Sequence, residues 1–272
     1  MIWAWILVAV LSAVILLLAS GRVQIKRGGI ALRRKSFVLE DGTKVWISDE
    51  LCVHPFARSR ALATRGGYYS RIPLFGNRLY LFRYCEELLL LLGETPIRRT
   101  LTLGGAGGGL PLYLANAYPD ARHDVVEISG ICIEICKRYF IPRGLFENGR
   151  ITLLHADAAA AVREFDAPYQ LIFCDVFNGG TPSGILSDTA FMQNLSRLAG
   201  EEGILILNGT GHTGVTLRPI VAQLEAAFGA IQVFLWGRKL VVVATNRKDF
   251  DAEKIPSQYG QYIPVYPSSL GK

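Results

Sequence analysis

Apolar residues follow two different patterns in the second half of this chain. After residue 99, short runs of consecutive apolar residues alternate with longer segments in which apolar residues recur every three or four positions. The short runs predict buried strands, and the longer segments predict amphipathic helices. This alternation predicts an α/β fold, in which helices cover both faces of a largely parallel sheet.

The predicted strands and helices follow one another in a regular order. The strands are residues 100–103, 123–128, 151–155, 171–175 and 204–208, and the helices are residues 110–117, 131–140, 158–165, 188–198 and 216–228. Residues 231–236 and 240–245 flank a Gly-Arg turn and predict a terminal hairpin. The hairpin would add an antiparallel strand to the otherwise parallel sheet.

The chain before residue 99 has a different character. Residues 37–39 and 45–47 are apolar and flank a polar turn, so they predict a small β-rich segment. Residues 58–71 are polar and contain two glycines, which predicts a loop. The leucine-rich residues 81–92 predict a helix.

The chain opens with an uninterrupted apolar run. Residues 2–19 contain one polar side chain, Ser12, and their number reaches the lower limit for a membrane-spanning helix. Basic residues follow the run, and such flanks tend to stay in the cytoplasm. We therefore expect a single-pass anchor in the cell membrane, with the body of the protein in the cytoplasm. The alternative is a cleaved secretory signal, but no basic segment precedes the run.

The charge of the chain argues against nucleic acid as a partner. The formal charge is +6, from 29 basic and 23 acidic residues in a chain of 272. The first 35 residues contain six basic residues and no acid, so the rest of the chain is formally neutral. A nucleic-acid-binding body would need a basic surface of its own. No metal site is expected either, because Cys132 and Cys136 have no second pair and no histidine nearby.

A glycine-rich run, residues 103–109, comes directly after the first strand of the alternating pattern. Glycines there allow a ligand to approach the backbone closely. Glu127 ends the next strand, where an acid can accept hydrogen bonds from both hydroxyls of a ribose, and Asp157 follows the third strand. These features predict a nucleoside site at the carboxyl edge of the sheet. The alternative is a purely structural loop.

Asp175 ends the fourth predicted strand and should face the same site. Residues 176–182 follow as a loop that could cover a substrate. The alternative is a structural carboxylate that caps this loop by accepting hydrogen bonds from its backbone. The residues leave both interpretations of Asp175 open.

Together these motifs resemble the spermidine synthase family, the polyamine aminopropyltransferases. The resemblance rests on residues 101–110, 126–140, 151–157 and 169–175, and it extends over about residues 84–208. It implies a seven-stranded Rossmann-like sheet of the class I methyltransferase type. It also implies that decarboxylated S-adenosylmethionine is a co-substrate rather than a permanently bound cofactor, and that a small-molecule amine receives its aminopropyl group.

The family also implies roles for individual residues. The acid that matches Glu127 holds the ribose, the acid that matches Asp157 lies beside the adenine, and the acid that matches Asp175 acts on the attacking amine. Tyr84 matches a tyrosine that lines the active site. The implied donor-binding residues are Gly104, Gly105, Gly107, Glu127 and Asp157, and the implied catalytic residues are Asp175 and Tyr84.

Three departures from the family pattern leave the reaction open. Gly107 replaces an aspartate beside the aminopropyl end of the donor, Asn178 replaces a second acid, and residues 233–236 replace a Pro-Thr-Tyr segment. Each change removes a group that would hold a polycation. Methyl transfer from ordinary S-adenosylmethionine, whose carboxylate Gly107 would tolerate, is one alternative. A non-catalytic nucleoside-binding module is the other.

The expected organisation has five parts. They are an anchor at 1–21, a basic juxtamembrane segment at 22–35, a small β-rich segment plus helix at 36–95, a nucleoside-binding α/β domain at 96–248 and an extended tail at 249–272. A homodimer is compatible with this organisation.

Overall fold

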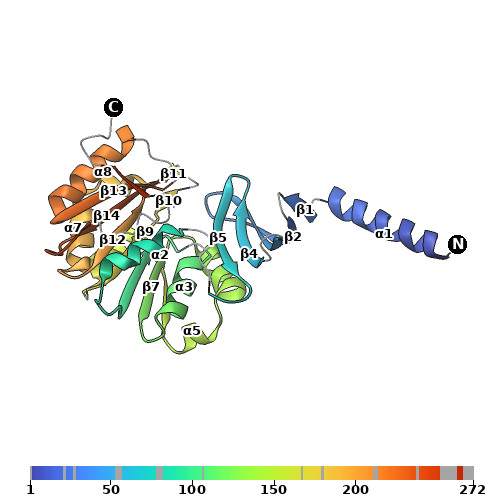
Figure 1. Ribbon diagram of the computed structural model, residues 1–272, viewed down its shortest axis with the longest axis horizontal. Helices are drawn as coiled ribbons and strands as arrows, with labels where there is room; N and C mark the ends of the chain where they lie inside the picture. Colours follow the sequence, from blue (N-terminus) through green and yellow to red (C-terminus); the bar gives the residue numbers. More distant parts are fainter. Residues whose placement is uncertain are drawn as a thin grey trace. The chain divides into compact units, whose positions relative to one another are not determined.

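The computed structural model describes residues 2–20, 23–26, 29–52, 57–77, 82–105, 107–166, 168–178, 181–210, 214–236, 239–251 and 262–265. The chain divides into two compact units, Met1–Tyr80 and Leu81–Lys272. Figure 1 shows both units, with many of their helices and strands labelled.

The first unit contains a helix and a five-stranded antiparallel sheet. Its elements are α1 (Ile2–Ala19), β1 (Val23–Lys26), β2 (Gly29–Val38), β3 (Lys44–Cys52), β4 (Ala57–Thr64) and β5 (Gly67–Pro73), and the strands lie in chain order. The prediction of a loop at residues 58–71 is wrong, because β4 and β5 occupy it. Arg60 lies opposite Asp49 of β3 and donates a hydrogen bond to its carboxylate at 2.8 Å. The polar residues that suggested a loop are thus partners across the sheet.

The first helix does not provide the expected anchor. Within the part of the chain that the structure describes, no helix combines the length and the apolar character needed to cross a membrane. The prediction of a single-pass membrane protein is therefore wrong.

The second unit is built on one mixed sheet. Its strands are β6 (Arg99–Leu103), β7 (Arg122–Glu127), β8 (Ile151–His155), β9 (Leu171–Cys174), β12 (Ile204–Asn208), β13 (Ala230–Trp236), β14 (Lys239–Thr245) and β15 (Tyr262–Val265). They lie in the order β15-β13-β14-β12-β9-β6-β7-β8. The five strands from β12 to β8 are parallel, and β14, β13 and β15 pair antiparallel. The predicted parallel sheet with a terminal hairpin is confirmed, and β15 extends its edge.

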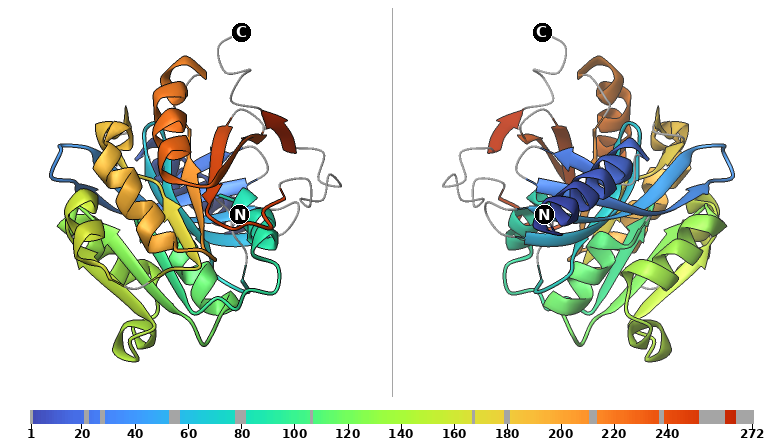
Figure 2. Two further views of the ribbon diagram at one scale, coloured as in Figure 1. Left: turned by 90° about the vertical axis from the view of Figure 1, so that its left-hand side faces the viewer. Right: turned by 90° about the vertical axis from the view of Figure 1, so that its right-hand side faces the viewer.

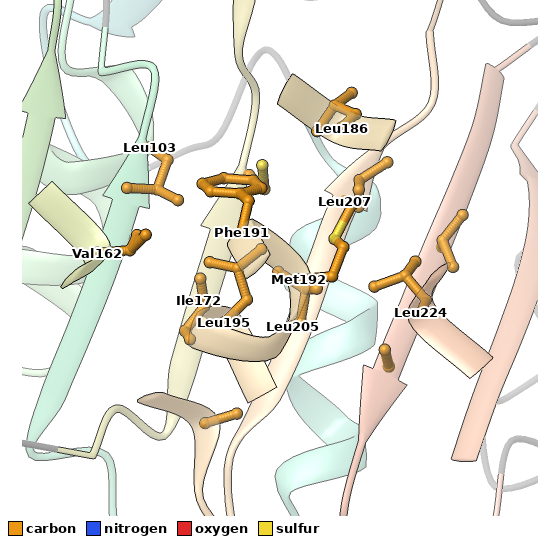
Figure 3. Packing of buried hydrophobic residues seen from close by; sticks show 14 of the residues in the cluster. Leu103, Val162, Ile172, Leu186, Phe191, Met192, Leu195, Leu205, Leu207 and Leu224 are labelled. Carbon is orange, nitrogen blue, oxygen red and sulfur yellow. The ribbon is translucent and has the colours of Figure 1, made fainter. Parts of the chain in front are cut away.

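Helices cover both faces of this sheet (Figure 2). The helices of this unit are α2 (Tyr84–Leu88), η1 (Leu89–Leu92), α3 (Gly109–Ala117), α4 (Gly130–Ile135), η2 (Cys136–Phe140), α5 (Gly144–Glu147), α6 (Ala158–Glu164), η3 (Gly184–Ser187), α7 (Thr189–Ala199) and α8 (Gly214–Ala227). Two short strands, β10 (Phe177–Asn178) and β11 (Thr181–Pro182), pair antiparallel with each other. A buried apolar cluster lies between the sheet and α6, α7 and α8. In Figure 3, Phe191 and Leu195 of α7 pack beside Leu205 of β12.

The strand order determines where a ligand can bind. From β6 the chain proceeds to β7 and β8 on one side, and later to β9 and β12 on the other. Such a reversal is the place where α/β sheets of this kind bind ligands, at the carboxyl ends of the parallel strands. Here the reversal lies between β6 and β9. We call the side of the sheet where β6, β7, β8, β9 and β12 end the carboxyl edge.

Candidate active site

The glycine loop, residues 104–109, follows β6 at the carboxyl edge. Gly104 has a φ of 85°, and its N–H donates to the carbonyl oxygen of Val126 at 2.9 Å. A Cβ on Gly104 would overlap the backbone carbonyl of Asp175, and one on Gly105 would overlap the side chain of Val125. The loop therefore needs glycine because it packs directly on the ends of β7 and β9. Gly107 is buried within the same loop.

Glu127 is the last residue of β7 and is 8% exposed. Its Oε1 accepts a hydrogen bond from the N–H of Ser129 at 2.9 Å. The charge of Glu127 contributes to the raised pKa of Asp175, which follows the last residue of β9. The structure thus brings these two carboxylates together, on opposite sides of the strand that leads into the glycine loop.

Asp157 follows β8, the strand next to β7 at the edge of the sheet, and it has a structural role. Its Oδ1 accepts hydrogen bonds from the N–H groups of Ala159 at 2.8 Å and Ala160 at 3.1 Å, so it caps the N-terminus of α6. The side chain is exposed. Both of these hydrogen bonds are accepted by Oδ1, and neither involves Oδ2.

Asp175 directly follows β9, and its backbone N–H donates to the carbonyl oxygen of Leu103 at 2.8 Å. Its Oδ1 accepts a hydrogen bond from Asn208 Nδ2 at 2.6 Å. Burial raises the pKa of Asp175 to about 6, although the hydrogen bond from Asn208 and the charge of Lys239 oppose the shift. The carboxylate is therefore a stronger base than an ordinary aspartate.

Two residues that the sequence analysis did not single out hold Asp175 in place. Asn208 ends β12 and is 5% exposed. Its Oδ1 accepts hydrogen bonds from Thr210 Oγ1 at 2.6 Å and from Thr210 N–H at 3.1 Å. The signal that could have identified Asn208 is the same one that identified Asp175, because both are polar residues at the end of a buried apolar strand.

Aromatic side chains pack behind Asp175. Tyr84 is 1% exposed, and its ring centroid lies 6.5 Å from that of Phe173, two residues before Asp175. Phe82 lies 5.0 Å from Phe173, centroid to centroid, and has a φ of 57°, which strains a side chain other than glycine. Burial raises the pKa of the Cys85 thiol, and the charge of Asp175 raises it further. The start of α2 therefore lies against Asp175.

The described residues contain no group of three His, Cys, Asp or Glu side chains that could hold a metal ion. The side chain of Asn178 lies outside the described part of the structure. The glycine loop packs on the ends of β7 and β9, and a carboxylate stands at each of these ends, Glu127 and Asp175. This combination suits a ligand with an adenosine end and a cationic end.

The sheet and the carboxylates at its edge place the chain among α/β proteins of the class I methyltransferase type. Comparison with known proteins narrows this class. Over 204 residues the chain is 31% identical to polyamine aminopropyltransferase 1 of Pseudomonas aeruginosa, covering 65% of this chain and 71% of that protein. The chain belongs to the polyamine aminopropyltransferase family.

Other relatives match shorter parts. The polyamine aminopropyltransferase of Vibrio vulnificus is 31% identical over 138 residues, which are 48% of this chain and 44% of that protein, so the chain matches less than half of its length. The mouse eEF1A lysine and N-terminal methyltransferase is 29% identical over 54% of this chain and 22% of that protein. No family model matches the sequence.

Solved structures agree with the fold. A probable spermidine synthase from Corynebacterium glutamicum superposes with a TM-score of 0.69 at 18% identity, covering 87% of this chain and 91% of that chain. Human methyltransferase-like protein 13, solved in complex with SAH, gives a TM-score of 0.51 at 25% identity, covering 59% of this chain and 76% of that chain. These likenesses confirm the predicted class I methyltransferase-type fold.

Proposed function

We propose that this protein is an aminopropyltransferase that moves an aminopropyl group from decarboxylated S-adenosylmethionine to a small-molecule amine. Membership of the polyamine aminopropyltransferase family supports this reaction. The observation that carries the proposal is the position and basicity of Asp175, whose backbone packs against Gly104 of the glycine loop and whose carboxylate has its pKa raised to about 6 by burial.

The donor would bind along the predicted nucleoside-binding part of the chain, residues 96–248. Gly104, Gly105 and Gly107 would let the donor approach the backbone, and Glu127 would accept hydrogen bonds from the ribose hydroxyls. Asp157 would approach the adenine through Oδ2, because Oδ1 caps α6. The close packing of the glycine loop and the burial of Glu127 support this arrangement.

The acceptor would bind on the Asp175 side, with Tyr84 and Phe173 behind it. An alkyl amine has a pKa near that of lysine, so removing its proton at pH 7 costs about 4 to 5 kcal/mol. Asp175 would first pair with the ammonium and then accept its proton. The amine nitrogen forms a bond to the methylene next to the sulfonium, and the carbon–sulfur bond breaks. The electron pair of that bond goes to the sulfur, which becomes a neutral thioether.

Most of the rate would come from alignment, because the sulfonium is already an activated leaving group. The contribution of Asp175 depends on its desolvation. The pKa of Asp175, about 6, is roughly two units closer to the pKa of the amine than the pKa of an ordinary aspartate is. This difference reduces the cost of proton transfer by about 3 kcal/mol.

Methyl transfer from ordinary S-adenosylmethionine is the second candidate. It is favoured by Gly107, which leaves room for the donor's carboxylate, and by the similarity to methyltransferases. Calorimetry with both donors, followed by mass spectrometry of an amine acceptor, distinguishes the two. Tighter binding of the decarboxylated donor and an acceptor heavier by an aminopropyl group would support our proposal. Preference for the ordinary donor with a methylated product would refute it, and binding of neither would indicate a non-catalytic protein.

A further inference from the structure

Three polar side chains lie in a row across the carboxyl edge of the sheet. Asp175 and Asn208 follow the paired residues Cys174 and Leu207 on the parallel strands β9 and β12. Asn208 pairs with Val241 of β14, and Lys239 lies two residues before Val241 on the same strand. Paired residues, and residues two apart on one strand, point to the same face of a sheet. Lys239 therefore shares a face with Asn208 and Asp175.

Lys239 is close enough to act on Asp175. Its side chain is half-buried, and its positive charge lowers the pKa of Asp175 against the effect of burial. Strands β9 and β14 are separated by β12 alone, so their backbones lie about 10 Å apart. An acceptor held by Asp175 at one end would thus have Lys239 near its other end.

The position of Lys239 should favour some amine acceptors over others. A diamine bound through one ammonium would bring its second ammonium toward Lys239, and like charges repel strongly where water is partly excluded. An amine with a carboxylate at the far end would be attracted instead. The family pattern has a second acid after the catalytic aspartate, and this chain has Asn178 at that position. A group that would bind a cation is therefore replaced by a neutral one.

We propose that Lys239 is a specificity-determining residue, and that the acceptor is an amine whose far end carries an acidic group rather than a second ammonium. This inference rests on the proposed function, because it takes Asp175 as the group that binds the reacting amine. It goes further than that function, because it assigns to Lys239 of β14 the recognition of the charge at the acceptor's far end.

Three amines of equal chain length isolate the effect of that charge. Putrescine, butylamine and 4-aminobutyrate share four carbons and one amine, and they end in an ammonium, a methyl group and a carboxylate. Binding of each is measured by calorimetry in the presence of methylthioadenosine, and aminopropyl transfer to each is measured with decarboxylated S-adenosylmethionine. The parent protein should prefer 4-aminobutyrate over butylamine, and butylamine over putrescine, in both measurements.

Variants at position 239 test whether the lysine causes this order. Lys239→Met should lower the preference for 4-aminobutyrate over putrescine by about 10- to 100-fold, whereas Lys239→Arg should largely keep it. Lys44→Met removes an exposed lysine from β3 of the first unit and is the matched control. It should leave the order of the three amines unchanged.

The outcomes separate this inference from the proposed function. A parent that prefers putrescine, or that binds none of the three amines, overturns the role of Lys239, and so does an unchanged order in Lys239→Met. If the amines bind in the expected order and Lys239→Met abolishes it, the inference stands. If no amine is then aminopropylated by the parent protein, the transfer reaction fails while the assignment of Lys239 survives.

Discussion

Replacing Asn208 with alanine should move the acidic limb of the pH–rate profile to higher pH. Asn208 donates to Asp175 at 2.6 Å and favours the charged form of that carboxylate, against the burial that raises its pKa to about 6. Without this donor the pKa of Asp175 must rise further. Since the base acts in its deprotonated form, activity is lost as pH falls through this pKa.

The size of the shift follows from the hydrogen bond. A hydrogen bond to a charged group contributes about 1.5 to 3 kcal/mol, which corresponds to about one to two pKa units. The limb should therefore move from about pH 6 toward about pH 7 to 8 in Asn208→Ala. At pH 6 kcat/KM should fall about five- to fiftyfold below the parent, because half of the parent's Asp175 is already protonated there, and at pH 9 most of this loss should disappear.

The assay is kcat/KM between pH 5 and pH 9, with donor binding measured at both ends. Thr210→Val is the matched control, because it removes a hydroxyl that donates to Asn208 but keeps the bond from Asn208 to Asp175. It should shift the limb by less than Asn208→Ala. An acidic limb that stays in place in a folded Asn208→Ala variant would refute the reasoning, as would an equal loss at every pH.

Three further changes test other parts of the site. Because burial raises the pKa of Asp175 to about 6 in the folded state, this residue stabilises the parent protein below its unfolded-state pKa, and the stabilisation is lost as pH rises through about 6. In urea unfolding, Asp175 should therefore lower the parent's free energy of unfolding at pH 8 by up to about 3 kcal/mol relative to pH 4. Asp175→Asn should abolish this difference. Gly104→Ala should abolish donor binding in calorimetry, whereas Gly200→Ala, which also has a positive φ but meets no atom closer than 3.6 Å, should preserve it. Glu127→Ala should weaken donor binding by about 1.5 to 3 kcal/mol in a folded variant; unchanged affinity would show that Glu127 does not bind the ribose.

The sequence was sufficient to predict the fold of the second unit. Buried strands and amphipathic helices produce different apolar periods, and the parallel strands place their ends at one edge. Glu127 and Asp175 could be identified for that reason, since each is an acid at the end of an apolar strand. The glycine loop between them could be recognised from composition alone.

Other features depend on contacts between distant residues. Asn208 was missed because a neutral amide at a strand end does not stand out as an acid does. Lys239 shares a face of the sheet with Asp175 because β14 pairs antiparallel with β12, and no local pattern specifies that pairing. Residues 58–71 were mistaken for a loop, because charged side chains such as Arg60 find their partners on a neighbouring strand. The capping role of Asp157 was missed as well, whereas the limits of α1 coincide with the apolar run at residues 2–19.

Turnover of Asp175→Asn is the most direct test of the account, because this change keeps the shape of the side chain and removes its basicity. Product formation from decarboxylated S-adenosylmethionine and an amine is measured together with donor affinity, for the parent and the variant. We expect turnover to fall by about 10²- to 10⁴-fold while donor affinity stays nearly unchanged. Parental turnover in a folded Asp175→Asn variant would contradict the proposed mechanism.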